Sequence, residues 1–142
     1  MLSVVLDTNV LVAAVRSSLG ASQRLLRQLP DARFRSAISV PLFAEYSAVL
    51  RRPAHLAGRT PEQVDAFLDF LLSVSNLHEI YYLWRPILSD PDDDMVLELA
   101  VAAGCRYIIT HNVADFRGCE HFGIEALTPG LFLRRLNDQE TP

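Results

Sequence analysis

Hydrophobic positions follow two patterns along the chain, namely short apolar runs and longer stretches with an apolar residue every three or four positions. The first run, at residues 4–6, ends abruptly in Asp7, Thr8 and Asn9, and helical spacing follows at once, as it does after a buried parallel strand. Further apolar runs predict strands over residues 34–40, 77–83, 106–109 and 124–127. Helical spacing predicts helices over residues 9–18, 22–29, 40–50, 61–74, 91–103 and 129–136.

The alternation of strands and helices predicts an α/β protein with a mostly parallel sheet flanked by helices. The sequence contains no repeat, linker or low-complexity segment, so we expect one domain over residues 1–142, with residues 137–142 as a frayed tail. Three helix starts carry specific signals. Ser39 is placed to cap a helix, Thr60 and Gln63 form a capping box, and Asp90 caps a helix whose first residue is Pro91.

Composition narrows the class of protein. Half of the residues are hydrophobic and 21% are charged, which is ordinary for a globular protein. No apolar run approaches the ~20 residues of a membrane span, and no signal peptide is recognisable, so we expect a cytoplasmic protein that does not enter a membrane. Cys105 and Cys119 match no tight metal-binding spacing, which favours free thiols in a reducing compartment.

The basic residues exclude several phosphate-binding classes. All 13 are arginines, and the chain contains no lysine. A P-loop needs its lysine on the phosphates, and phosphoryl-aspartate enzymes and receiver domains rely on a lysine that pairs with the phosphoryl group. The net charge of −4 argues against a protein that coats nucleic acids, but it allows a nuclease with an acidic site and a local positive rim.

Carboxylates recur where predicted strands end and helices begin. These residues are Asp7, Glu45, Asp93 and Asp115. The turns that follow parallel strands meet at the carboxyl edge of a sheet, so these groups can converge there. Four carboxylates close together do not all stay ionised without a cation, and an all-oxygen ligand set favours Mg²⁺ or Mn²⁺. Mg²⁺ bound by carboxylates typically serves phosphate substrates.

Each of these positions also has a structural interpretation. Asp7 fits a helix cap as well as a functional carboxylate, and Glu45 fits the boundary of its helix. The helix dipole favours acids in the first turn, yet the three consecutive residues Asp92–Asp94 repel one another. Helical spacing places Asp93 on the apolar face of that helix, with Asp92 and Asp94 diverging to either side. His111 lacks a partner at a fitting spacing, so we assign it no catalytic role.

Three segments carry a resemblance to a known family: VVLDTNVLV, ISVPLFAEYSAVLRRP and SDPDDDMVLELAVAAGCRYIITHNVADF. Together they resemble a PIN domain, and more narrowly the toxins of bacterial type II toxin–antitoxin pairs. The resemblance covers nearly the whole chain. It implies a three-layer α/β/α sandwich and metal-dependent endoribonuclease activity.

The family's acids are carried over by position. The first aspartate corresponds to Asp7, the helix glutamate to Glu45, and the aspartate of the third motif to Asp93. The fourth position stays open, because many relatives have an aspartate where this chain has Asn112, whereas others use the acid that is Asp115 here. Thr8 and Asn9 match the small polar residues beside the first aspartate.

The expected mechanism follows from metal chemistry. One or two Mg²⁺ or Mn²⁺ ions held by the four acids would polarise a phosphodiester and activate water. The polar residues expected to orient the water or the ligands are Thr8, Asn9, Asp94, Thr110 and Asn112. Flanking phosphates are expected to contact Arg51 and Arg52, with Arg16 or Arg59 as further candidates, although solvated surface charge explains these arginines equally well.

The expected partners are an RNA substrate, a small antitoxin protein and a second copy of the chain in a homodimer. Two other functions are compatible with the sequence. One is a module of PIN fold that binds nucleic acid or protein without cutting, and the other is a metal-dependent hydrolase of small phosphate esters. An intact set of Asp7, Glu45 and Asp93 argues against the first.

Overall fold

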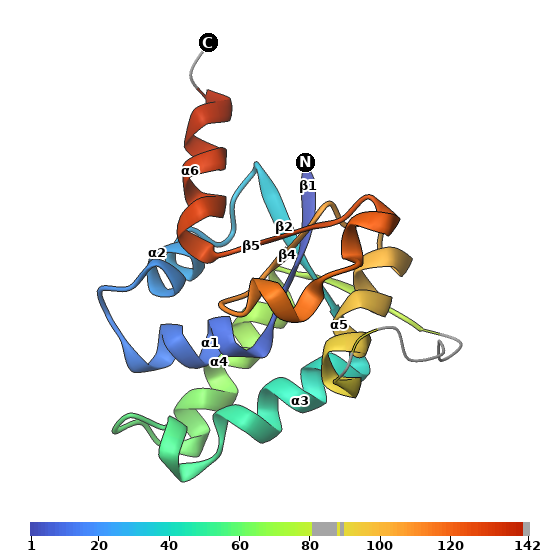
Figure 1. Ribbon diagram of the computed structural model, residues 1–142. Helices are drawn as coiled ribbons and strands as arrows, with labels where there is room; N and C mark the ends of the chain where they lie inside the picture. The colour runs from blue at the N-terminus through green and yellow to red at the C-terminus, as the bar shows by residue number, and fades with distance from the viewer. Residues whose placement is uncertain (81–87, 89, 141–142) are drawn as a thin grey trace.

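A central parallel sheet with helices on both faces forms the fold of the computed structural model (Figure 1). The structure describes residues 1–80, 88 and 90–140. The strands are β1 (Leu2–Leu6), β2 (Phe34–Ser39), β3 (Asn76–His78), β4 (Tyr107–Ile109) and β5 (Glu125–Leu127). The helices are α1 (Thr8–Arg16), α2 (Ala21–Arg27), α3 (Val40–Leu50), α4 (Pro61–Ser73), α5 (Pro91–Ala102) and α6 (Pro129–Glu140). Short 3₁₀ turns are η1 (Pro53–His55), η2 (Val113–Phe116) and η3 (Cys119–Phe122).

All strand pairs are parallel, in the order β3-β2-β1-β4-β5. The chain first moves outward from β1 to β2 and β3, and then returns past β1 to β4. Since such crossovers are right-handed, the reversal places α5 on the opposite face from α1 to α4. Helix α5 packs against β1, β2 and β4, whereas α1 contacts α2 and α3. The predicted three-layer α/β/α sandwich is therefore confirmed.

The reversal of strand order also locates a crevice. Strand β1 is the central strand, and its residues Val4, Val5 and Leu6 are fully buried. It pairs with β2 on one side and with β4 on the other. In sheets of this kind, ligands bind outside the carboxyl ends of the two strands at which the order reverses. Asp7 follows β1 and Thr110 follows β4, so both lie at this point.

The predicted helix starts are confirmed. The hydroxyl of Ser39 accepts a hydrogen bond from the Leu42 amide at 3.2 Å and caps α3. Thr60 and Gln63 form the capping box of α4. Asp90 caps α5, and Gly104, with a φ of 65° that favours glycine, follows its end.

Several predicted boundaries are wrong. Strand β2 ends at Ser39, not at the predicted residue 40, because Ser39 caps α3 and Val40 is the first residue of that helix. Helix α6 continues to Glu140, past the predicted end at Leu136. Its last turn consists of polar residues, so the spacing of apolar residues does not reveal that the helix continues there. Strand β3 ends at His78, and residues 81–83 of the predicted strand lie outside the described residues.

The core is made of the apolar faces that the sequence predicted. The ring of Phe132 in α6 packs edge-on against Phe34 of β2 and Tyr107 of β4, with centroids 5.2 and 5.7 Å apart. Cys105 and Cys119 are buried free thiols, as expected. Among the described helices, none combines the length and the apolar character that crossing a membrane requires.

Candidate functional site

Asp7 both caps a helix and presents a carboxylate at the crevice. One carboxylate oxygen accepts a hydrogen bond from the Thr8 amide at 2.8 Å, at the start of α1. The other accepts from the Thr110 hydroxyl at 2.8 Å. Only 9% of Asp7 is exposed. The cap occupies one oxygen, so capping by Asp7 does not exclude a functional role for its carboxylate.

The environment of Asp7 raises its pKa above the ordinary value for an aspartate. Burial raises its pKa, and the hydrogen bonds from Thr110 and Thr8 oppose that change. The negative charges of Asp115 and Asp90 raise the pKa further. These carboxylates come from separate segments, so tertiary folding brings acids far apart in the sequence close to Asp7.

Glu45 on α3 points toward the same crevice. The Thr8 hydroxyl donates to its carboxylate at 2.7 Å. Burial, together with the charges of Asp92 and Asp7, raises the Glu45 pKa. The next residue, Tyr46, is buried and donates its hydroxyl to the Leu6 carbonyl at the end of β1. Helix α3 is thus tied directly to the strand that precedes Asp7.

Asp93 on α5 has a strongly raised pKa. Burial raises its pKa to about 7, and four other aspartates contribute. In decreasing order of effect they are Asp7, Asp90, Asp115 and Asp92. The predicted acids Asp7, Asp93 and Asp115 are therefore close enough to repel one another. Asp90 and Asp92 join them, although the sequence suggested only a cap and a first-turn acid at these positions.

The predicted orientation of the three consecutive aspartates is only partly right. Asp93 is partly exposed, whereas Asp94 is 8% exposed and so is the most buried of the three. The Asp94 carboxylate accepts a hydrogen bond from the Leu88 amide at 2.9 Å. Glu98, one turn further along α5, is also buried. The buried face of α5 therefore includes two acids, which a pattern of apolar residues could not identify.

The residues after β4 form a hydrogen-bonded network with α1. The hydroxyl of Thr110, which is fully buried, accepts from the Asn9 side chain at 3.3 Å and from the Asn112 amide at 3.0 Å. The Asn9 side chain in turn accepts from the His111 amide at 3.2 Å. Asn112 and Asp115 are both exposed, and only Asp115 adds negative charge at the crevice.

Two of the arginines predicted to contact RNA phosphates make other contacts within the protein. Arg51 lies just beyond the last residue of α3 and forms an ion pair with Asp65 of α4, with a nitrogen–oxygen distance of 3.8 Å. Arg59 donates to the Val15 carbonyl at the end of α1. Arg52 is exposed. On this geometry, Arg51 and Arg59 already have protein partners.

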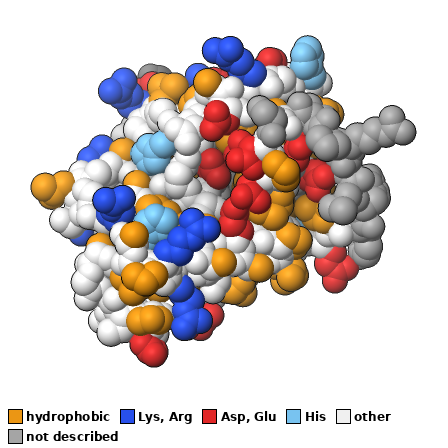
Figure 2. Space-filling model, turned by 60° about the horizontal axis from the view of Figure 1, so that its bottom comes forward, with side chains coloured by type: hydrophobic (Ala, Val, Ile, Leu, Met, Phe, Trp, Pro, Cys, Tyr) orange, Lys and Arg blue, Asp and Glu red, His pale blue; other side chains and the backbone are white. Residues whose placement is uncertain are grey.

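Acidic side chains gather near the middle of one face, and arginine and histidine side chains lie to the left of them and along the upper edge of the molecule (Figure 2). Within the described residues, however, no three His, Cys, Asp or Glu side chains are arranged so that they could hold a metal ion together. The acids are close enough to raise one another's pKa but do not form a closed coordination shell. Their carboxylate oxygens are of the type that Mg²⁺ and Mn²⁺ prefer, and a cation would relieve their repulsion.

Comparison with known families identifies the fold. A family model described as a PIN domain matches residues 3–114. The chain belongs to the PIN-domain family. PIN domains are generally metal-dependent nucleases, so membership supports a nuclease-type, hydrolytic function for this chain. The match includes Asp7, Glu45 and Asp93 and ends one residue before Asp115. No curated protein was found to match the sequence.

Sequence reasoning missed the contacts that surround the PIN acids. The Thr8 bond to Glu45 joins residues 37 positions apart, and the Thr110 bond to Asp7 joins residues 103 positions apart. The contact between Thr110 and Asp7 could have been predicted from their positions, because Thr110 directly follows β4 and Asp7 directly follows β1. Neighbouring strands at a point of reversal bring such residues together.

Proposed function

We propose that this PIN domain is an endoribonuclease that hydrolyses RNA phosphodiester bonds with Mg²⁺ or Mn²⁺. The observation that carries the proposal is the gathering of acids at the carboxyl edge of the sheet. Thr8 links Asp7 to Glu45 there, and the neighbouring aspartates help to raise the pKa of Asp93 to about 7. Such a concentration of negative charge is costly to hold without a cation. Family membership supports the nuclease class, and RNA is the substrate that the sequence resemblance implies.

Asp7, Glu45, Asp93 and Asp115 are the residues proposed to hold the metal. When bound, the ion would polarise the phosphodiester and lower the pKa of a coordinated water. The protein's part is to hold the ligands in place. Thr110 and the Thr8 amide fix the two oxygens of Asp7, while the Thr8 hydroxyl fixes Glu45. One residue, Thr8, therefore links two proposed ligands.

The test is cleavage of a fluorescent RNA by purified protein, with Mg²⁺, with Mn²⁺ and with a chelator. We expect metal-dependent cleavage that Glu45→Gln reduces more than tenfold, which is more than about 1.4 kcal/mol of barrier. Glu62→Gln is the matched control, since Glu62 is an exposed glutamate on α4. A single-stranded DNA of the same sequence and a small phosphate ester complete the comparison.

The outcomes distinguish the three functions considered for the chain. RNA cleavage that needs metal and Glu45 supports the proposal. RNA binding without cleavage under all metal conditions would instead indicate a binding module. Hydrolysis of the small ester alone would indicate a phosphatase-like enzyme.

We further propose that the domain is the toxin of a toxin–antitoxin pair and acts in the cytoplasm. The support is the resemblance of its motifs to such toxins. Induced expression of the wild type should arrest bacterial growth, whereas Asp7→Asn should not. Coexpression of the small reading frame beside the gene should restore growth, and failure to arrest growth would contradict the role.

A homodimer is the proposed assembly. Large exposed apolar side chains include Leu19 in the turn between α1 and α2, Phe70 on α4 and Leu131 on α6, which are 84%, 46% and 39% exposed. Covering some of them would stabilise an association. Light scattering at tens of micromolar protein should give twice the mass of the chain, and a monomer would contradict the proposal.

A further inference from the structure

A row of polar residues leads away from the carboxylates along the edge of the sheet. Thr110 contacts Asp7, Asn9 contacts Thr110, and the His111 amide donates to Asn9. The distances are 2.8, 3.3 and 3.2 Å in that order. The backbone of His111 is therefore fixed relative to Asp7 through two intervening side chains.

The imidazole ring of His111 is held at a second point. Its Nε2 lies 2.8 Å from the hydroxyl oxygen of Ser22 on α2. Ser22 is 1% exposed, whereas His111 is exposed. The two residues are 89 positions apart, and no local pattern predicts that they meet. An exposed side chain thus has a buried anchor, which restricts its rotamers.

Either partner of the contact with Ser22 could be the donor, and the needs of the Ser22 hydroxyl assign the tautomer of the neutral ring. A buried hydroxyl needs an acceptor for its proton, and Nε2 is the acceptor that the described residues offer. If Ser22 donates to Nε2, the ring proton lies on Nδ1. Within the described part of the chain, Nδ1 makes no hydrogen bond. With this tautomer, the exposed ring presents an N–H donor from the residue that follows Thr110, and Thr110 contacts Asp7.

We propose that His111 binds the RNA backbone, donating from Nδ1 to a phosphate oxygen next to the scissile phosphate, and that Ser22 positions the ring. This inference rests on the proposed nuclease function. A nuclease with an acidic centre needs neutral or cationic donors at its rim, because its carboxylates repel the flanking phosphates. Contacts to phosphate fix the register of a nucleic acid on a protein.

A purely structural role for the pair makes a different prediction. If Ser22 and His111 only attach α2 to the turn after β4, then changing either residue lowers the melting temperature and leaves RNA affinity unchanged. A role in RNA binding predicts loss of affinity in protein that remains folded. The two roles are separated by measuring RNA affinity and melting temperature on the same variants.

The binding experiment uses Asp93→Asn protein, in which we expect cleavage to be slowed by well over tenfold, and a fluorescently labelled RNA followed by anisotropy. Adding His111→Ala should raise Kd about tenfold, because a hydrogen bond to a charged group is lost. Adding Ser22→Ala should raise it by about threefold, because the ring is then free to rotate. Combining both should be no worse than His111→Ala alone, since Ser22 acts only through the ring.

His121→Ala is the matched control, because His121 is an exposed histidine on η3. It should leave Kd unchanged. In the active protein, His111→Ala should raise KM about tenfold and change kcat by less than about threefold, the pattern of lost uniform binding. His111→Gln, which keeps an N–H donor, should recover part of the affinity. Nitrogen NMR should show the proton on Nδ1 and a shift of that signal when RNA is added.

Unchanged Kd and KM in folded His111→Ala, or additive losses in the double variant, would overturn the role of His111. They would leave the proposed nuclease function standing if the wild type cleaves RNA. Absence of metal-dependent cleavage by the wild type would instead contradict the proposed function itself.

Discussion

Among the residues of this PIN domain, the three consecutive aspartates show how closely neighbouring side chains can differ in role. Asp93 lies in the field of four other acids, and its pKa rises to about 7. Asp94 is buried and accepts a hydrogen bond from the Leu88 amide. Asp92 is exposed and raises the pKa of Glu45. Capping alone would make the three residues nearly equivalent.

Substitution should separate these roles. Asp93→Asn should lower RNA cleavage by well over tenfold, or more than about 1.4 kcal/mol of barrier, because a proposed metal ligand loses its charge. Without metal its stability should be equal to or above that of the wild type, because repulsion is relieved. Asp92→Asn and Asp94→Asn should stay within severalfold of wild-type activity.

Asp94→Ala should instead lower the free energy of unfolding by about 1–3 kcal/mol, because the Leu88 amide loses a buried acceptor. The measurements are cleavage of a fluorescent RNA with Mn²⁺ and urea unfolding. Equal activities for the three asparagine variants would contradict the assignment of Asp93, and so would an inactive Asp94→Asn beside an active Asp93→Asn.

At the scale of elements, a hydrogen bond between α3 and β1 positions Glu45 relative to Asp7. The Tyr46 hydroxyl donates to the Leu6 carbonyl, one residue before Asp7, and Tyr46 follows Glu45 directly. Tyr46→Phe should cost about 1–3 kcal/mol of stability, because it leaves a buried carbonyl without this donor. It should also lower cleavage severalfold, because Glu45 loses its fixed distance from Asp7.

Ser39→Ala provides the comparison for Tyr46→Phe. It removes the cap of α3 at a cost of about 1 kcal/mol but leaves the contact with β1 intact. Its activity should stay near that of the wild type when both proteins are folded. Equal activity losses in the two variants, measured against urea unfolding curves, would show that the contact with Leu6 has no special role.

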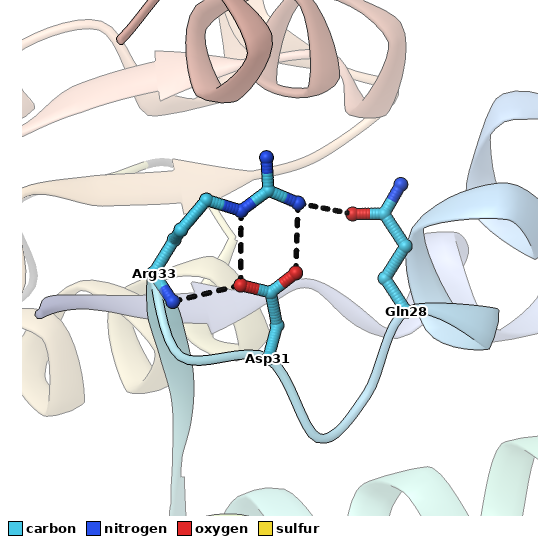
Figure 3. Close-up of polar contacts among 3 residues, drawn as sticks. All are labelled: Gln28, Asp31 and Arg33. Atoms are coloured by element: carbon cyan, nitrogen blue, oxygen red, sulfur yellow. Dashed lines mark hydrogen bonds and ion pairs between the residues drawn. The ribbon is translucent and has the colours of Figure 1, made fainter. Parts of the chain in front are cut away.

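The turn between α2 and β2 is held by a different kind of contact (Figure 3). The guanidinium of Arg33 donates to both carboxylate oxygens of Asp31, at 3.0 and 2.8 Å, and to the Gln28 side chain at 2.9 Å. The Arg33 amide also donates to Asp31 at 2.7 Å. These contacts hold the Asp31 pKa below its usual value, chiefly through the hydrogen bond from the Arg33 side chain.

A lowered pKa in the folded state predicts a stability difference that depends on pH. Asp31→Asn should reduce the free energy of unfolding by about 1 kcal/mol at neutral pH, where the bidentate pair is complete. An aspartate in the unfolded chain has a pKa of about 3.9. The stability difference should therefore be present above that pH and disappear as the pH falls through the lower pKa of Asp31 in the folded protein. Urea unfolding at several pH values measures it.

The control for Asp31 is Asp69→Asn, which changes an exposed aspartate on α4. Its stability should match the wild type across the same pH range. A difference between wild type and Asp31→Asn that persisted at low pH would show that charge pairing is not its source.

For the whole molecule, the concentration of acids at one edge of the sheet makes stability depend on metal. Binding of Mn²⁺ to the folded state alone should raise the melting temperature by mass action. Asp7→Asn should melt above the wild type without metal, because repulsion falls while its amide oxygen can still cap α1 at Thr8. It should lose most of the rise that Mn²⁺ causes.

Thermal unfolding with and without Mn²⁺ checks this prediction. Asp69→Asn should respond to the metal as the wild type does, because its carboxylate is exposed on α4. If Asp7→Asn and the wild type respond to Mn²⁺ alike, Asp7 is not a ligand.

The sequence by itself determined the features that depend on neighbours along the chain. The apolar run at residues 4–6 predicted a buried strand, and Ser39, Thr60 and Asp90 predicted three helix starts. Strand-to-helix alternation predicted the parallel sheet, and a parallel sheet brings its carboxyl-end turns to one edge. That was enough to propose Asp7, Glu45 and Asp93 as one group.

Only the tertiary structure decided which side chains meet. The return of the chain from β3 to β4 puts Thr110 beside Asp7 and places His111 within reach of Ser22 on α2. The packing of α5 on β1, β2 and β4 decided that Asp94 would be buried and Asp93 left facing the other acids. Such contacts depend on the exact rotation and register of elements distant in sequence, and a local pattern of apolar and polar residues does not record either.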